Sequence, residues 1–212
     1  FTSYDLKAYL LSCSLLKKIN ETEIDYIKYI VDNQIDKIGM HKSYNFLEHS
    51  KFINNLSEIK NILLFSKSNK SNVFDEVILK MTSILNEYFH LDGSLALFNG
   101  TNNVYTINIY KSLNKESYLK KREFSNINNG IAFYSDKNKK IFFDVVQPNS
   151  DMISSNLSAG TLSIELSGFG EKILSNCGAS ESFGKNPEYL RYSAAHSTII
   201  LQNTNISEIK ED

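Results

Sequence analysis

The chain has 212 residues, 42% of them hydrophobic and 12% aromatic, which is enough to bury a core in one or two domains. The formal net charge is only -1 and lysine supplies nearly all of the basic residues, so nucleic acid is not expected as a partner. No stretch approaches the ~20 consecutive apolar residues that a membrane-spanning helix needs. Because the sequence opens on Phe1 rather than Met, we expect it to be a fragment of a longer protein.

Residues 1–92 show the periodicity of helices. Apolar residues recur at three- and four-residue spacing, most clearly over 73–88. Similar patterns predict helices over 6–17, over 24–35 and, less regularly, over 46–65. A short polar connector over 66–72 separates the helix over 46–65 from the one over 73–88, which is typical of antiparallel neighbours. The apolar stripes indicate packing surfaces rather than cofactor sites.

After the helices the period changes to two, which predicts a second domain of antiparallel strands over residues 93–212. Segments 131–135 and 140–146 flank a four-residue turn and predict a β-hairpin. Apolar and polar residues alternate over 161–166, so one face of this strand is expected to be buried in a sheet. Its antiparallel partner is expected over 171–176.

Two further segments and a junction complete the prediction. Segment 104–112 alternates like a strand, and 197–206 is expected to be a strand led by a histidine. Between the helical and the strand domain, His90, Asp92 and Gly93 predict a tight turn. There the aspartate would bond to backbone amides and the glycine would adopt dihedral angles that other residues avoid.

The most specific signal is an ordered run of short motifs. The sequence reads Ala-Gly-Thr-Leu-Ser-Ile-Glu-Leu at 159–166, Asn-Cys-Gly at 176–178 and Ala-Ala-His-Ser-Thr at 194–198. In order and spacing these motifs resemble the sandwich core of heparinase II/III-like proteins. Segment 90–100 resembles the part that joins the helical domain of that family to its sheet domain. The resemblance implies an α+β fold, in which the end of an α/α toroid helical domain is followed by an antiparallel β-sandwich.

The same resemblance implies an activity. Members of this family are typically polysaccharide lyases or their relatives, so we expect β-elimination on an acidic, uronate-containing polysaccharide such as a glycosaminoglycan or alginate. The full-length chain, not the fragment alone, is expected to be active. Family behaviour also implies a bacterial protein of the periplasm or cell envelope. The rival expectation is a non-catalytic carbohydrate-binding or envelope-structural relative, and the oligomeric state is left open.

Lyases of acidic polysaccharides remove the proton α to a uronate carboxylate, stabilise the resulting charge and protonate the departing oxygen. The resemblance points to His196, which matches a motif histidine, and to Asn156, which occupies the position of another. Arg191 lies five residues before His196 and its guanidinium could clamp a carboxylate. These three residues are the catalytic candidates. The basic clusters at 120–122 and 137–140 could meet a polyanionic glycan, although solvated turns explain them as well.

Tyr189 and Tyr192 flank the arginine, and a sugar ring could stack on either of them, so both are substrate-binding candidates. Ser158, at the second motif histidine, is the third. Family members that hold zinc take ligands from positions that align with Ser158, Asn176 and His196. Because serine and asparagine are poor zinc ligands, this site is expected to be degenerate and no cofactor is expected. An isolated histidine is more often a hydrogen-bonded packing residue, so a structural role for His196 stays open.

Overall fold

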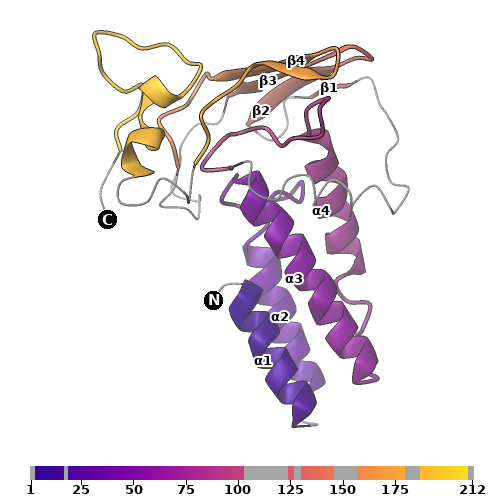
Figure 1. Cartoon of the computed structure of the whole chain (residues 1–212). Coiled ribbons are helices and arrows are strands. Elements are labelled where there is room, and N and C mark those ends of the chain that lie inside the picture. Colours follow the sequence, from indigo (N-terminus) through magenta and orange to yellow (C-terminus); the bar gives the residue numbers. More distant parts are fainter. Residues whose placement is uncertain are drawn as a thin grey trace.

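A computed structural model describes residues 3–16, 19–102, 124–126, 130–145, 157–179 and 187–209. In this part of the chain, helices lie side by side and a five-stranded sheet covers one end of them (Figure 1). The helices are α1 (Ser3–Leu15), α2 (Glu21–Asn33), α3 (Phe46–Phe65) and α4 (Asp75–Glu87). The predicted α+β fold is therefore confirmed. Among the described helices, none combines the length and the apolar character of a membrane span.

The helices form where the apolar periodicity predicts them. Asn20 caps α2 by accepting a hydrogen bond from the backbone N–H of Thr22 (3.1 Å), and Asn45 caps α3 in the same way. Both α1 and α4 pack against α3. Leu56 and Ile59 of α3 are completely buried, so this helix is the centre of the bundle.

Aromatic rings join the bundle to the sheet. Phe46, at the start of α3, stacks on Tyr88, which follows α4, with ring centroids 4.2 Å apart. Tyr88 in turn lies 6.1 Å from each of two sheet residues, Phe133 and Phe142. Such pairs add to the stabilisation that burial alone provides. Helices and sheet thus share one apolar core. The predicted boundary between two domains at residue 92 stays a prediction.

The sheet is an antiparallel meander in the order β1-β2-β3-β4-β5. Its strands are β1 (Phe124–Asn126), β2 (Ile131–Ser135), β3 (Lys139–Asp144), β4 (Ile164–Gly168) and β5 (Glu171–Leu174). The predicted hairpins, β2 with β3 and β4 with β5, are both confirmed. Strand β4 begins later than predicted, because Leu162 has a φ of 64° and belongs to the preceding turn.

The inward face of β4 is polar, which reverses the burial expected from its alternation. Glu165 and Ser167 are completely buried, whereas Ile164 is 37% exposed. The reversal occurs because the helix-to-sheet connector supplies hydrogen-bond donors beneath β4, as described below. The outward face carries apolar side chains from neighbouring strands, among them Ile141 and Leu174. A second layer of the predicted sandwich would pack on such a face.

The prediction of a strand over 197–206 is wrong. The described chain has only an isolated bridge there, between Leu201 and Thr204. Gln202 and Asn203 have φ values of 52° and 58°, and they close a tight turn that interrupts any strand. Two short 3-10 helices, η1 (Pro187–Arg191) and η2 (Ser193–Ala195), precede this region. The strand predicted over 104–112 lies outside the described residues.

Candidate functional site

His196 lies directly after η2 in extended backbone. The next residue, Ser197, donates its backbone N–H to Asn176 Oδ1 at 2.9 Å, which ties this segment to the chain that follows β5. The imidazole packs over Gly160, where a Cβ atom would come within 3.1 Å of the ring. Gly160, in the first family motif, therefore makes room for His196.

The environment of His196 keeps its ring neutral. Burial lowers the pKa of His196 below its ordinary value, and a hydrogen bond to the backbone carbonyl of Leu190 and the charge of Glu165 oppose this only in part. Its Nε2 atom is buried and has no hydrogen-bond partner among the described residues. A neutral imidazole with an uncommitted nitrogen can take up a proton and release it again.

Arg191 and Tyr192 line a cavity of about 470 Å³ at the end of η1. Arg191 donates its Nε–H to the carbonyl of Leu157 at 3.0 Å, which fixes the base of the guanidinium. The cavity is also lined by Glu188 and Glu208, so two carboxylates face one guanidinium. This balance of charge does not attract a polyanion into the cavity. Arg191 and Tyr192 are therefore brought together, but not in a basic pocket.

The other candidates are placed less closely. Tyr189 and His196 are not among the residues that line the cavity, and Tyr189 is 47% exposed. Ser158 is half-buried and lies beside Arg191, because its neighbours on both sides hydrogen-bond to that arginine. Asn156 lies outside the described residues.

The residues at the aligned zinc positions do not fit a zinc ion. Asn176 Oδ1 already accepts the backbone N–H of Ser197, so the free end of its side chain is an N–H donor that repels a cation. Ser158 contributes at best a weak hydroxyl ligand, which leaves His196 as the single strong ligand. In the described ranges, no three His, Cys, Asp or Glu side chains gather closely enough to hold a metal.

A buried hydrogen-bonded pair beneath β4 was not predicted from the sequence. His90 Nε2 donates to Glu165 Oε2 at 2.7 Å, and both side chains are completely buried. Burial lowers the pKa of His90, and the hydrogen bond and charge of Glu165 act against it. The predicted turn at this junction is confirmed, since Asp92 Oδ1 accepts the N–H of Ser94 at 2.8 Å and Gly93 has a φ of 81°. The sequence carries only a weak signal for the pair, namely that the alternate residues Ser163, Glu165 and Ser167 are all polar.

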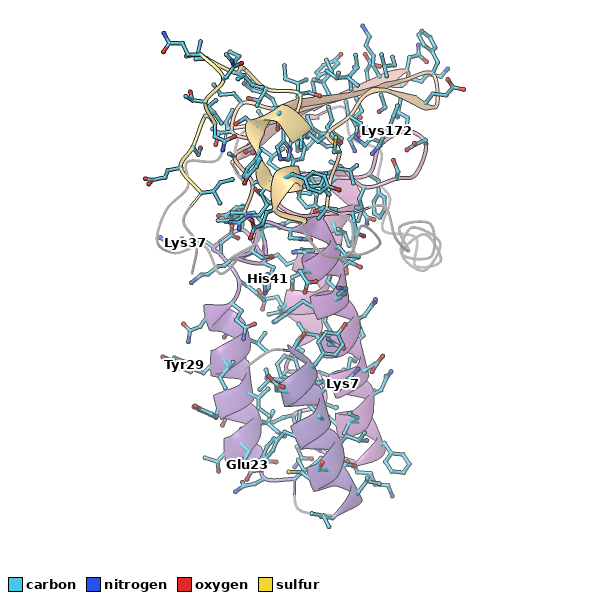
Figure 2. The ribbon with its side chains drawn as sticks, turned by 60° about the vertical axis from the view of Figure 1, so that its left-hand side comes forward. Lys7, Glu23, Tyr29, Lys37, His41 and Lys172 are labelled. Carbon is cyan, nitrogen blue, oxygen red and sulfur yellow. The ribbon has the colours of Figure 1, made fainter. Side chains whose placement is uncertain are left out.

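Lys172 lies near this pair, beneath the sheet on the side of the helices (Figure 2). Its Nζ is 4.0 Å from Glu165 Oε2 and donates to the carbonyl of Leu95 at 3.0 Å. Lys140 is also directed inward, where its Nζ donates to the carbonyl of Phe89 at 2.7 Å, and burial lowers its pKa to about 8. The basic cluster at 137–140 therefore cannot present all of its lysines to a glycan.

Two further histidines, which the sequence analysis did not single out, lie at the end of the bundle nearest the sheet, where Figure 2 labels His41. His49 Nδ1 accepts the backbone N–H of His41 at 3.1 Å, and His49 Nε2 donates to the carbonyl of Met81 at 2.9 Å. Burial lowers the pKa of each histidine to about 4. Because both ring nitrogens of His49 are used, it is a structural residue.

The chain is similar to known proteins in its C-terminal sequence and in its whole fold. Residues 122–212 match the family model described as Heparinase II/III-like, C-terminal, which confirms the resemblance seen in the motifs. A comparison with curated protein sequences gives no significant match.

Solved structures extend the likeness to the helices. The crystal structure of heparan sulfate lyase HepC from Pedobacter heparinus matches 96% of this chain with a TM-score of 0.70 and 13% identity. A crystal structure of heparinase III matches 94% with a TM-score of 0.75 and 14% identity. This chain spans only 37% and 38% of the lengths of these two proteins. At such low sequence identities the likeness establishes the fold alone. It stays a prediction that these helices are the end of an α/α toroid.

Proposed function

We propose that the full-length protein is a polysaccharide lyase, because residues 122–212 match the heparinase II/III-like family model and the chain folds like heparinase III. Its reaction is β-elimination on an acidic polysaccharide that contains uronate units. One of the similar structures is a heparan sulfate lyase, which supports a glycosaminoglycan as the substrate class. The observation that carries the proposal is the family match over the segment that contains His196 and Arg191.

In this proposal His196 transfers the proton. The elimination needs a group that removes the proton next to a uronate carboxylate, or that delivers one to the departing oxygen. A neutral imidazole with an unpartnered Nε2 suits either step. Because its Nε2 is buried, binding of the substrate must uncover this nitrogen before the proton can be transferred.

Arg191 and Asn156 have the second role, which is to stabilise charge on the uronate. Arg191 uses its Nε–H for Leu157, and the remaining N–H groups of the guanidinium can pair with a carboxylate. The opposing carboxylates in its cavity make this a site for a single uronate rather than for a densely charged segment. Asn156 supplies a neutral donor to the same group.

Tyr189, Tyr192 and Ser158 contact the neighbouring sugar units. Both tyrosines are half-exposed on the same short helix and its end, at 47% and 43%, so their rings are open to stacking. Ser158 lies beside Arg191 and offers a hydroxyl to a sugar. The partner of this surface is therefore a polysaccharide chain.

The test uses the full-length protein with a panel of glycosaminoglycans, alginate and neutral glycans. Cleavage by elimination leaves an unsaturated uronate, whose ultraviolet absorbance rises as the reaction proceeds. We expect absorbance with at least one acidic glycan and with none of the neutral ones. Absence of product with every acidic glycan would contradict the proposal.

The second candidate is a non-catalytic carbohydrate-binding or envelope-structural relative. The residues that favour it are Asn156 and Ser158, which stand where the resemblance to the family leads us to expect histidines. Saturable binding of an acidic glycan without release of an unsaturated product would support this candidate.

We also propose that the full-length protein works in the periplasm or cell envelope, where an extracellular polysaccharide is accessible. Fractionation of the source cells, followed by immunodetection, tests this. Recovery of the protein in the cytoplasmic fraction alone would contradict it.

A further inference from the structure

One carboxylate beneath the sheet collects hydrogen bonds from separate segments of the chain. Glu165 Oε2 accepts from His90 Nε2 at 2.7 Å and from the backbone N–H of Leu97 at 3.1 Å. Its Oε1 accepts from the backbone N–H of Asn176 at 2.9 Å and from Ser175 Oγ at 3.2 Å. A completely buried carboxylate is stable only where donors replace its water, and these four donors do so.

The four donors come from both sides of the helix-to-sheet junction. His90 and Leu97 belong to the connector that leaves α4, whereas Ser175 and Asn176 follow β5. Glu165 itself is the second residue of β4. The carboxylate therefore fixes the end of β5 relative to the helices.

The contacts continue from the end of β5 to His196. Segment 175–177 is joined to segment 195–197 by hydrogen bonds on both sides of the histidine. These run from Ser197 N to Asn176 Oδ1 (2.9 Å), from Ser197 Oγ to Ser175 O (3.2 Å) and from Cys177 N to Ala195 O (3.0 Å). Residues that bond to Glu165 thus hold the chain on both sides of His196, together with a direct bond from Ile164 N of β4 to Ser197 O (3.1 Å).

We infer that Glu165 is a positioning residue of the candidate site, which acts through Asn176 to hold His196 over Gly160. The inference rests on the proposed role of His196 and extends it to a residue that does not touch the substrate. Since misplacement of a reacting group by about 1 Å can cost on the order of 100-fold in rate, a buried clamp of this kind matters for turnover. In this chain a carboxylate joins the segments beside His196, and the other two aligned zinc positions, Ser158 and Asn176, lack strong ligands.

The position of the Glu165 carboxylate relative to His196 can be followed through the pKa of the imidazole. The negative charge of Glu165 raises the pKa of His196 against the larger effect of burial. Lys172 and His90 are the other titratable groups near the carboxylate. Removal of the charge at 165 should therefore lower the pKa of His196 further.

The experiment compares Glu165→Gln with Ser167→Ala in the full-length protein labelled with ¹⁵N-histidine. Ser167 is the matched control, because it is completely buried on the same face of β4 and its hydroxyl accepts the N–H of Leu91, in the connector, at 3.4 Å. The readouts are the NMR titration of the His196 ring, assigned by its loss in His196→Ala, and kcat and KM on the glycan that the wild type cleaves.

We expect Glu165→Gln to shift the His196 resonances, lower its pKa and reduce kcat by about tenfold or more with little change in KM. Ser167→Ala should leave all four quantities near the wild-type values. Wild-type resonances and pKa for His196 in Glu165→Gln would overturn the inference. This readout is independent of catalysis, so it separates a failure of the clamp from a failure of the lyase proposal.

Asn176→Ala provides a second, milder break in the same path. It removes the bond to Ser197 and leaves the backbone N–H that Glu165 binds, so it decides the question if Glu165→Gln does not fold. We expect displaced His196 resonances and a lower kcat. Unchanged resonances in Asn176→Ala would show that His196 is held by other contacts.

Discussion

The helical bundle and the underside of the sheet are stabilised in different ways. In the bundle, completely buried side chains such as Leu10, Leu56 and Ile59 are apolar and need only close packing. Under the sheet, Glu165 and Lys140 are buried, and each needs specific partners. The bundle is therefore sensitive to a loss of side-chain volume, whereas the sheet underside is sensitive to the loss of a hydrogen-bond partner. His196, which is proposed to transfer the proton, is tied through Asn176 to the part of the sheet that depends on hydrogen-bond partners.

The largest expected effect is the loss of the buried carboxylate. Glu165→Ala leaves His90 Nε2 and the backbone N–H groups of Leu97 and Asn176 without an acceptor, and it should lower the free energy of unfolding by about 3 to 5 kcal/mol. Glu171→Ala, at an exposed position of β5, is the control and should change it by less than about 0.5 kcal/mol. Chemical unfolding of the full-length protein measures both, and equal small effects would mean that the carboxylate contributes no net stability.

In the bundle, Leu56→Ala should cost about 2 to 5 kcal/mol, because it opens a cavity in a completely buried site. Leu64, on the same helix, is 49% exposed, so Leu64→Ala should cost much less. The same unfolding measurement applies. A larger loss in Leu64→Ala than in Leu56→Ala would indicate that the exposed face of α3 is covered in the full-length protein.

At the candidate site, His196→Ala should lower turnover by about 100-fold or more if the imidazole acts as acid or base, with little change in stability. Steady-state rates and thermal melting of the full-length protein separate the two roles. Retained activity together with a loss of roughly 1 to 3 kcal/mol in stability would make His196 a structural residue.

Acid should weaken the bundle through His49. Its folded pKa of about 4 lies below the value of about 6.5 expected when unfolded, so in acid the unfolded state binds the proton first. The stabilisation is complete above pH 6.5 and falls as the pH drops toward 4, by roughly 2 kcal/mol between pH 7 and pH 5. Urea unfolding at both pH values measures this, and His49→Gln should reduce the dependence. An undiminished dependence in that variant would assign it to other groups.

The smallest expected effect is that of metal removal. Because Ser158 and Asn176 replace strong ligands, a chelator should leave the melting temperature unchanged, and elemental analysis should find no stoichiometric zinc. One zinc per chain would show that other residues provide the ligands.

The helices and hairpins could be predicted from the sequence because their signals are local. Apolar spacing gave α3 over the predicted range 46–65, and the turn after Ser135 identified the β2–β3 hairpin. The ordered motifs around His196 were specific enough to indicate the family that the C-terminal segment matches. In contrast, local alternation misjudged 197–206, where Gln202 and Asn203 adopt positive φ values and turn the chain.

Tertiary structure alone decided the setting of the candidate site. Nothing local shows that Glu165 faces inward, because a strand fixes only that its alternate residues share a face and not which face is buried. That choice was made by His90 and Leu97, 75 and 68 residues away in the chain, whose donors make burial of the carboxylate favourable. Packing likewise placed His196 over Gly160. The sequence by itself determined the elements and the family motifs, and long-range hydrogen bonds decided which polar residues became the interior.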